Sequence, residues 1–218
     1  MAKKKTISGS DIISIYMEYV LEHNAQPNSV YSFAKANNFE EIKFYEHFAS
    51  FVALEQSIFK EFFDNAFSVL EKSEDYYSFD SRNKLLSFYF TFFEVLTVNR
   101  SYVVYALEHQ KDHLKKMRSL GKLKQRFTLY IEHLDIPLFE INLETIEKAQ
   151  TKTLKESAWL QLLFTMKFWL EDTSSSFEKT DVFIEKAVNT SFDLIDTKPL
   201  KSIIDLGKFL FKEKMQMN

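Results

Sequence analysis

Residues 29–54 constrain the fold of this chain more than any other stretch. Ser29 is a favoured N-cap residue, and apolar residues follow it at helical spacing. The polar pair Asn37-Asn38 interrupts this pattern with residues that favour tight turns, and a second apolar run begins at Phe39. The stretch therefore predicts two short helices joined by a tight turn, which is the outline of a helix-turn-helix.

The rest of the chain favours helices throughout. Its 218 residues include only 3 Gly and 3 Pro, whereas sandwiches, barrels and phosphate-cradling α/β folds need glycine-bearing turns. Long segments rich in Glu, Lys, Leu, Ala and Phe favour helices instead. We expect an all-α protein of about nine or ten helices. A small three-helix, homeodomain-like domain would occupy residues 1–50, and a larger helical bundle would occupy residues 51–218.

The apolar periodicity also predicts where the helices begin and end. We expect Ser10 to cap the first helix and residues 73–78 to form a polar break. In the second helix of the helix-turn-helix, we expect Phe39, Ile42, Tyr45 and Phe48 to face inward. The predicted helices span about 11–23, 30–36, 39–48, 51–72, 80–98, 100–119, 122–134, 143–172, 180–196 and 199–211.

Several functional classes are excluded by what the chain lacks. It contains no cysteine, so disulfides, thiolate metal sites and cysteine nucleophiles are excluded. No window reaches the roughly 18 apolar residues of a membrane span. The start Met-Ala-Lys-Lys-Lys has no apolar region behind it, unlike a secretory signal. Because it also lacks a glycine-rich phosphate loop and a nucleophile elbow, we expect a cytoplasmic, non-enzymatic protein without a cofactor.

The helix-turn-helix resembles the DNA-binding domain of the TetR family of transcriptional regulators. The pattern of that family begins Ile-Ala-x-x-Ala-Gly-Val-Ser and ends Tyr-x-x-Phe-x-Ser-Lys-x-x-Leu. Here Phe33-Ala34 stands at the Ile-Ala place, and Asn37-Asn38-Phe39 stands at the Ala-Gly-Val place. Tyr45-Glu-His-Phe48-Ala-Ser50 and Leu54 match the second part. A small helical triad followed by a larger bundle is also similar to the layout of that family.

The resemblance implies a homodimer, joined through C-terminal helices at about residues 180–215, that binds operator DNA with its N-terminal triad. It also implies an apolar small-molecule effector in the helical body. Each side chain that could contact DNA also has a plainer interpretation as part of a solvated tail, a helix cap, a scaffold aromatic or a surface histidine. The candidates for DNA contact are Lys3, Lys4, Lys5, Ser29, Tyr31, Lys43, Tyr45 and His47.

The charge of this region has the opposite sign to that of a typical DNA-binding surface. Residues 28–55 contain two basic and four acidic side chains, so their net charge is 2 − 4 = −2. Affinity for DNA, in contrast, comes largely from neutralised phosphates. Glu40 stands where the family usually has Ser or Thr, and Phe51 stands where it has Lys. These residues leave open a protein of the same fold that has lost DNA binding and binds a lipid or quinone as an accessory factor.

Phenylalanine is unusually frequent, with 23 residues. This number is compatible with a cavity for a flat or long apolar effector, and equally with a Phe-biased core. Glu94 lies within an apolar run, where it either faces a cationic ligand or meets Arg100 or water. The residues expected to line an effector cavity are Phe88, Phe92, Phe93, Glu94, Phe127, Phe164, Phe168 and Trp169.

Two further stretches carry candidate chemistry. His109 and His113 have the i, i+4 spacing of a metal-binding pair, but no third ligand is apparent, so we interpret them as exposed histidines and expect no metal.

Residues 111–126 carry seven basic side chains and one acidic one around an apolar stripe, 7 − 1 = +6. This basic segment either contacts a membrane surface or an acidic partner, or forms the solvated outer face of a bundle helix.

The sequence thus predicts a TetR-like transcriptional regulator whose DNA binding is controlled by an apolar effector. The lipid- or quinone-binding accessory factor is the alternative. A helical dimerisation module without a ligand is a third interpretation. Salt-dependent duplex binding separates the first two, because only phosphate contacts release counterions. Apolar material that co-purifies with the protein would argue against the third.

Overall fold

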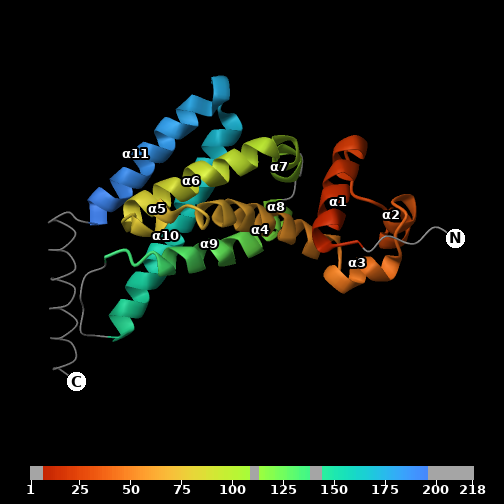
Figure 1. Ribbon diagram of the computed structural model, residues 1–218, viewed down its shortest axis with the longest axis horizontal. Coiled ribbons are helices and arrows are strands. Elements are labelled where there is room, and N and C mark those ends of the chain that lie inside the picture. Colours follow the sequence, from red (N-terminus) through yellow and green to blue (C-terminus); the bar gives the residue numbers. More distant parts are fainter. Residues whose placement is uncertain (1–6, 109–112, 138–143, 196–218) are drawn as a thin grey trace. The chain divides into compact units, whose positions relative to one another are not determined.

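The computed structural model describes residues 7–108, 113–137 and 144–195, which form eleven α-helices, one short 3-10 helix and no strand (Figure 1). The predicted all-α fold is confirmed. Within these residues, no helix is both long and apolar enough to span a bilayer. Some predictions lie outside the described residues, namely those on Lys3, Lys4 and Lys5, on His109, on the helix at 199–211, and on part of the dimer segment at 180–215.

The helices are divided between two compact units, each of which draws on two separate stretches of the chain. The first unit comprises Met1–Ser68 and Phe92–Arg126, and the second comprises Val69–Thr91 and Phe127–Asn218. The helices are α1 (Gly9–His23), α2 (Val30–Ala36), α3 (Glu41–His47), α4 (Phe51–Leu70), α5 (Glu74–Ser78), α6 (Ser81–Val98), α7 (Arg100–Leu107), α8 (His113–Ser119), α9 (Gly121–His133), α10 (Glu144–Glu171) and α11 (Glu178–Ile195), with the 3-10 helix at Ser175–Phe177.

The sequence predicts that Ser10 caps the first helix, but the cap is Ser8. The Ser8 hydroxyl accepts a hydrogen bond from the Asp11 N–H at 3.1 Å, and the Asp11 carboxylate accepts one from the Ser8 N–H at 2.9 Å. Asp11 stands three residues after Ser8, which is the spacing of a capping box. Because Ser10 lacks an acidic residue at that distance, the reciprocal cap forms one half-turn earlier than predicted.

The predicted polar break at residues 73–78 contains a short helix, α5. Glu74 and Asp75 occupy its first turn, where negative charge is favourable at a helix N-terminus. Tyr76 is buried, and its hydroxyl oxygen lies 3.0 Å from that of Tyr130 in the same unit. The prediction of an irregular segment is wrong because this buried tyrosine anchors an otherwise polar sequence.

The N-terminal helices α1, α2 and α3 enclose an aromatic core. Phe33 lies at its centre and meets Tyr16 and Phe44 edge to face, with ring centroids 6.1 and 6.4 Å away. Phe51, the first residue of α4, has its ring 5.7 Å from that of Phe33. Tyr16 also donates a 2.7 Å hydrogen bond to Oε1 of Glu55, a buried carboxylate on α4. These contacts attach the helix-turn-helix to the beginning of α4.

The prediction of the buried face of α3 is right for Phe39 and Phe48, which are buried, and wrong for two other residues. Phe44 and Phe48, which are one turn apart, are buried. Ile42 and Tyr45 have exposed fractions of 59% and 49%, so the prediction that they face inward is wrong. Ile42 stands two residues before Phe44, which is roughly 200° around the helix. Burial of Phe44 therefore directs Ile42 to solvent.

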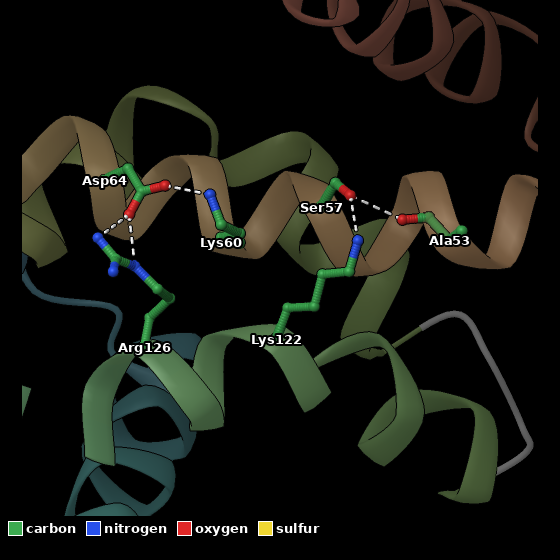
Figure 2. Close-up of polar contacts among 6 residues, drawn as sticks. All are labelled: Ala53, Ser57, Lys60, Asp64, Lys122 and Arg126. Atoms are coloured by element: carbon green, nitrogen blue, oxygen red, sulfur yellow. Dashed lines mark hydrogen bonds and ion pairs between the residues drawn. The ribbon is translucent and has the colours of Figure 1, made fainter. Parts of the chain in front are cut away.

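A polar cluster joins α4 to the first turns of α9 within the first unit (Figure 2). The Lys122 ammonium donates a 2.8 Å hydrogen bond to the Ser57 hydroxyl. The Arg126 guanidinium forms an ion pair with Asp64 at 2.8 Å, and Lys60 pairs with the same carboxylate. Lys122 and Arg126, two cations of the basic segment at 111–126, are thus paired with residues of α4, so this segment is not a purely solvated face.

The second unit contains a buried aromatic core and the helix pair α10 and α11. Phe88 and Phe127 are fully buried, with ring centroids 5.6 Å apart. The helices α10 and α11 pack against each other. In the turn between them, the Asp172 carboxylate accepts four hydrogen bonds of 2.7–2.9 Å from the N–H and hydroxyl groups of Ser174 and Thr180. This turn fixes the ends of both helices.

Candidate functional site

A cavity of about 1140 Å³ opens in the second unit, and residues of α10 and α11 form most of its wall. Typical pockets for small molecules have volumes of roughly 300–1,000 Å³, so this cavity is large enough for a sizeable ligand. Large apolar side chains dominate the wall. They include Leu85, Ile131, Leu154, Phe164, Phe183 and Ile195.

Several apolar side chains of the wall are accessible to solvent. Leu160, Phe164 and Leu194 have exposed fractions of 51%, 65% and 60%. Apolar surface transferred out of water contributes roughly 25 cal/mol per Å² to binding. Exposed apolar residues that gather around a concavity are typical of a site for an apolar ligand or for another apolar protein surface.

Two buried amide groups on α10 interrupt this apolar wall. The Nε2 atoms of Gln150 and Gln161 are buried and have no hydrogen-bond partner among the described residues. The Gln161 carbonyl oxygen accepts a 2.7 Å hydrogen bond from the Ser191 hydroxyl on α11, which fixes the orientation of the amide. A buried donor without a partner is costly, so rotation of either side chain toward an acceptor in the cavity would be favourable.

One cation also belongs to the wall. Lys186 on α11 lines the cavity and forms no hydrogen bond or ion pair with any residue that the structure describes. Its ammonium group supplies three further donors. The hydroxyl groups of Thr153, Ser157 and Thr190 also stand on the wall. The cavity therefore combines apolar area with donors that are available to a ligand.

The residues predicted to line the cavity are distributed over several places. Phe164 lies on the wall. Phe168 stacks on Phe183, a wall residue, with ring centroids 4.6 Å apart. Glu94 is exposed, as contact with water would require. The others, Phe88, Phe92, Phe93, Phe127 and Trp169, are buried side chains that do not line this cavity.

Sequence reasoning missed Gln150, Gln161 and Lys186. A signal was present for Gln161, because it is the one polar residue in the run Trp159-Leu-Gln-Leu-Leu-Phe164. Gln150 stands eleven residues earlier, which is about three helical turns, so both glutamines share a face of α10. No pattern in the sequence singles out Lys186, since its role depends on the packing of α11 against α10.

The second candidate surface is the outer side of the helix-turn-helix. Ser29 caps α2, accepting a 3.1 Å hydrogen bond from the Ser32 N–H, as predicted. Asn38 has a φ of 58°, a left-handed conformation that Asn tolerates better than most residues, and it closes the tight turn. Tyr31 is exposed, and the Lys35 ammonium lies 5.8 Å from its ring centroid.

The candidate DNA contacts on α3 are exposed or half-buried, but the cation among them is already paired. Lys43 donates to both carboxylate oxygens of Glu46, at 2.7 and 2.9 Å. Tyr45 and His47 are exposed, and the Tyr45 hydroxyl lies 3.5 Å from the Glu41 carboxylate. The order of α2, a tight turn and α3 is that of a helix-turn-helix, whereas the local charge does not favour phosphates.

The cavity lies within a part of the chain that matches a known family model. A family model described as "Tetracyclin repressor-like, C-terminal domain" matches residues 84–210, which is more than half of the chain. The matched range contains α10 and α11, and with them most of the cavity wall. No curated protein matches the chain.

Proposed function

Because the chain belongs to the TetR family of transcriptional regulators, we propose that it is a homodimer whose DNA binding is controlled by an apolar small molecule. Residues 1–50 bind the operator, and residues 51–218 hold the effector and the dimer interface. The interface is formed by helices at about residues 180–215. The dimer exists in a state that binds DNA tightly and a state that binds it weakly. The effector changes the affinity for DNA to the extent that the effector binds one of these states more tightly than the other.

The observation that carries the proposal is the cavity inside the family-matched residues. It has a volume of about 1140 Å³, a mostly apolar wall and exposed aromatic surface at Phe164. The proposed effector is therefore apolar along most of its length.

On the DNA side, the proposed contacts are made to the phosphate backbone. Tyr31, Tyr45 and His47 are exposed on the helix-turn-helix and can donate hydrogen bonds. Lys43 contacts a phosphate oxygen after its ion pair with Glu46 breaks. Ser29 stands at the N-terminus of α2, and the basic arm of Lys3, Lys4 and Lys5 adds charge.

A second candidate function is favoured by the pairing of Lys43 with Glu46. If that pair persists, the helix-turn-helix offers little positive charge, and exposed Ile42 and Tyr31 give it a partly apolar surface. The protein would then be a lipid- or quinone-binding accessory factor of the same fold that no longer binds DNA.

The test is fluorescence anisotropy of the full-length protein with a random-sequence duplex, titrated from low to physiological salt. Regulator function predicts binding whose logarithmic affinity falls linearly with the logarithm of salt concentration. Lys43→Gln should lower the slope by about 0.9, as expected for one lost phosphate contact. Lys72→Gln, which removes an exposed lysine outside the helix-turn-helix, is the control. Absence of binding at low salt would favour the accessory factor.

A further inference from the structure

The polar groups on the cavity wall select a class of ligand within the broad category of apolar effectors. The two unpartnered amides are donors, and the wall cation Lys186 is also a donor. A hydrocarbon would leave all three without an acceptor, at the cost of a buried unsatisfied group for each amide. The ligand must therefore carry oxygen acceptors at defined places.

The positions of these donors along the two helices give the ligand a direction. Lys186 precedes Ser191 by five residues, or about 7.5 Å of helix rise, and Ser191 is bonded to Gln161. Lys186 and Gln161 both line the cavity, so a ligand at this end can contact both side chains. Gln150 lies about 16 Å from Gln161 along α10. One end of the cavity thus has a cation and an amide, and the other has a single amide.

We propose that the cavity binds a long-chain carboxylic acid that carries a further oxygen along its chain. The carboxylate lies between the Lys186 ammonium and the Gln161 amide, and the second oxygen accepts from Gln150. The chain between them covers the apolar wall of Leu154 and Phe164. This inference rests on the proposed effector-binding function and narrows it to one chemical class.

The charge of the wall supports a carboxylate over a cationic head group. Lys186 is the sole ionisable residue among the described residues that line this cavity, so no acidic side chain among them competes for the ligand. Hydrogen bonds to charged groups are stronger than those between neutral groups. The carboxylate is therefore expected to dominate the orientation of the ligand.

The experiment measures displacement of the neutral fluorescent probe N-phenylnaphthylamine from the full-length protein by octadecanoic acid and by its methyl ester. The acid should bind about tenfold more tightly than the ester. Lys186→Gln should remove this difference, mainly by weakening the binding of the acid. Lys179→Gln, which changes an exposed lysine two turns earlier on the same helix, should keep it.

The second oxygen is tested with 12-hydroxyoctadecanoic acid. The hydroxy acid should bind more tightly than octadecanoic acid to the unmodified protein. The two acids should bind equally tightly to the Gln150→Leu variant. Equal binding to the unmodified protein would overturn the assignment of Gln150. Circular dichroism of each variant checks that a loss of preference does not come from unfolding.

The remaining outcomes separate failure of this inference from failure of the proposed function. If the acid and its ester bind equally to the unmodified protein, the carboxylate assignment is wrong and the apolar effector stands. If neither they nor the fluorescent probe bind, effector binding fails as well. In that case a photo-crosslinker at position 164 should capture residues 196–218 or a second copy of the chain, either of which would then be the occupant of the cavity.

Discussion

The side-chain hydroxyl of Tyr16 connects the helix-turn-helix to α4 through a hydrogen bond to Glu55. Tyr16 is fully buried, and burial, with a smaller effect of the Glu55 carboxylate, raises the pKa of its hydroxyl. The hydroxyl therefore remains a donor to Glu55. Tyr16→Phe should lower the free energy of unfolding by about 1–3 kcal/mol, because it leaves a buried carboxylate without this donor. Urea denaturation at pH 7 measures the difference.

The control for this change is on the same helix. Tyr19 makes no hydrogen bond with its hydroxyl to any described residue, so Tyr19→Phe should alter the free energy of unfolding by less than about 0.5 kcal/mol. A second check is Glu55→Gln, which removes the charge and should reduce the cost of Tyr16→Phe in the double variant. Equal effects of the two Tyr→Phe changes would contradict the assignment.

Asp172 makes stability depend on pH through the turn between α10 and α11. Burial alone raises the pKa of its carboxyl, but the hydrogen bonds from Ser174 and Thr180 outweigh burial and hold this pKa well below its ordinary value of 3.8. A depressed pKa in the folded state contributes stability above the ordinary pKa, and this contribution is lost as the pH falls toward the folded value. Asp172→Asn should therefore lower the urea midpoint by the same amount at pH 7 and pH 5, and by less below pH 3.8. A difference that is unchanged at pH 3 would contradict this account.

At the residue scale, some local interactions were predictable, whereas the tertiary ones were not. Ser29 was identified as a cap because its partners lie within three residues. Gln150 and Gln161 were not identified, because an amide becomes an unpartnered donor only through the packing around it. The Phe-rich runs likewise do not reveal which rings meet each other and which, like Phe164, meet a cavity.

At the scale of elements, most helix positions follow from the sequence, but the orientation of a short helix does not. A helix of seven residues such as α3 has barely two turns, so apolar residues at 39, 42, 44, 45 and 48 fit more than one buried face. Packing against Phe33 selected Phe44 and left Ile42 in solvent. The long helices α4 and α6 had enough turns to define their extent within a few residues.

The exposed face of α3 gives a prediction about charge. Glu46→Gln breaks the pair with Lys43 and raises the net charge of the DNA-facing helices by one. Binding to a random duplex at low salt should become about threefold tighter, and the salt slope should increase by about 0.9. Glu18→Gln on α1 removes the same charge from an exposed site outside the helix-turn-helix and is the control. If the affinity for the duplex increases equally in both variants, net charge and not Lys43 determines that affinity.

At the scale of the whole molecule, the fold class followed from composition because so few glycines and prolines leave little besides helices. The division into two units, each built from two separate stretches, was not apparent from a pattern that runs along the chain. Contacts between distant segments decide that division, and a single sequence does not show them. The family match extends over α10 and α11, where the amino-acid pattern alone carried little specific information.

Regulation by an effector requires a single free energy of coupling between effector binding and DNA binding. If the effector weakens duplex affinity by a given factor, the duplex must weaken effector affinity by the same factor. We expect a factor of about 5–150, the usual range for allosteric proteins. Duplex anisotropy with and without saturating octadecanoic acid gives one ratio, and calorimetry of the acid with and without saturating duplex gives the other. Two equal ratios above one identify a regulator. Ratios of one, with both ligands bound, would mean that the cavity and the helix-turn-helix act independently, and the protein would then carry its ligand without controlling transcription through it.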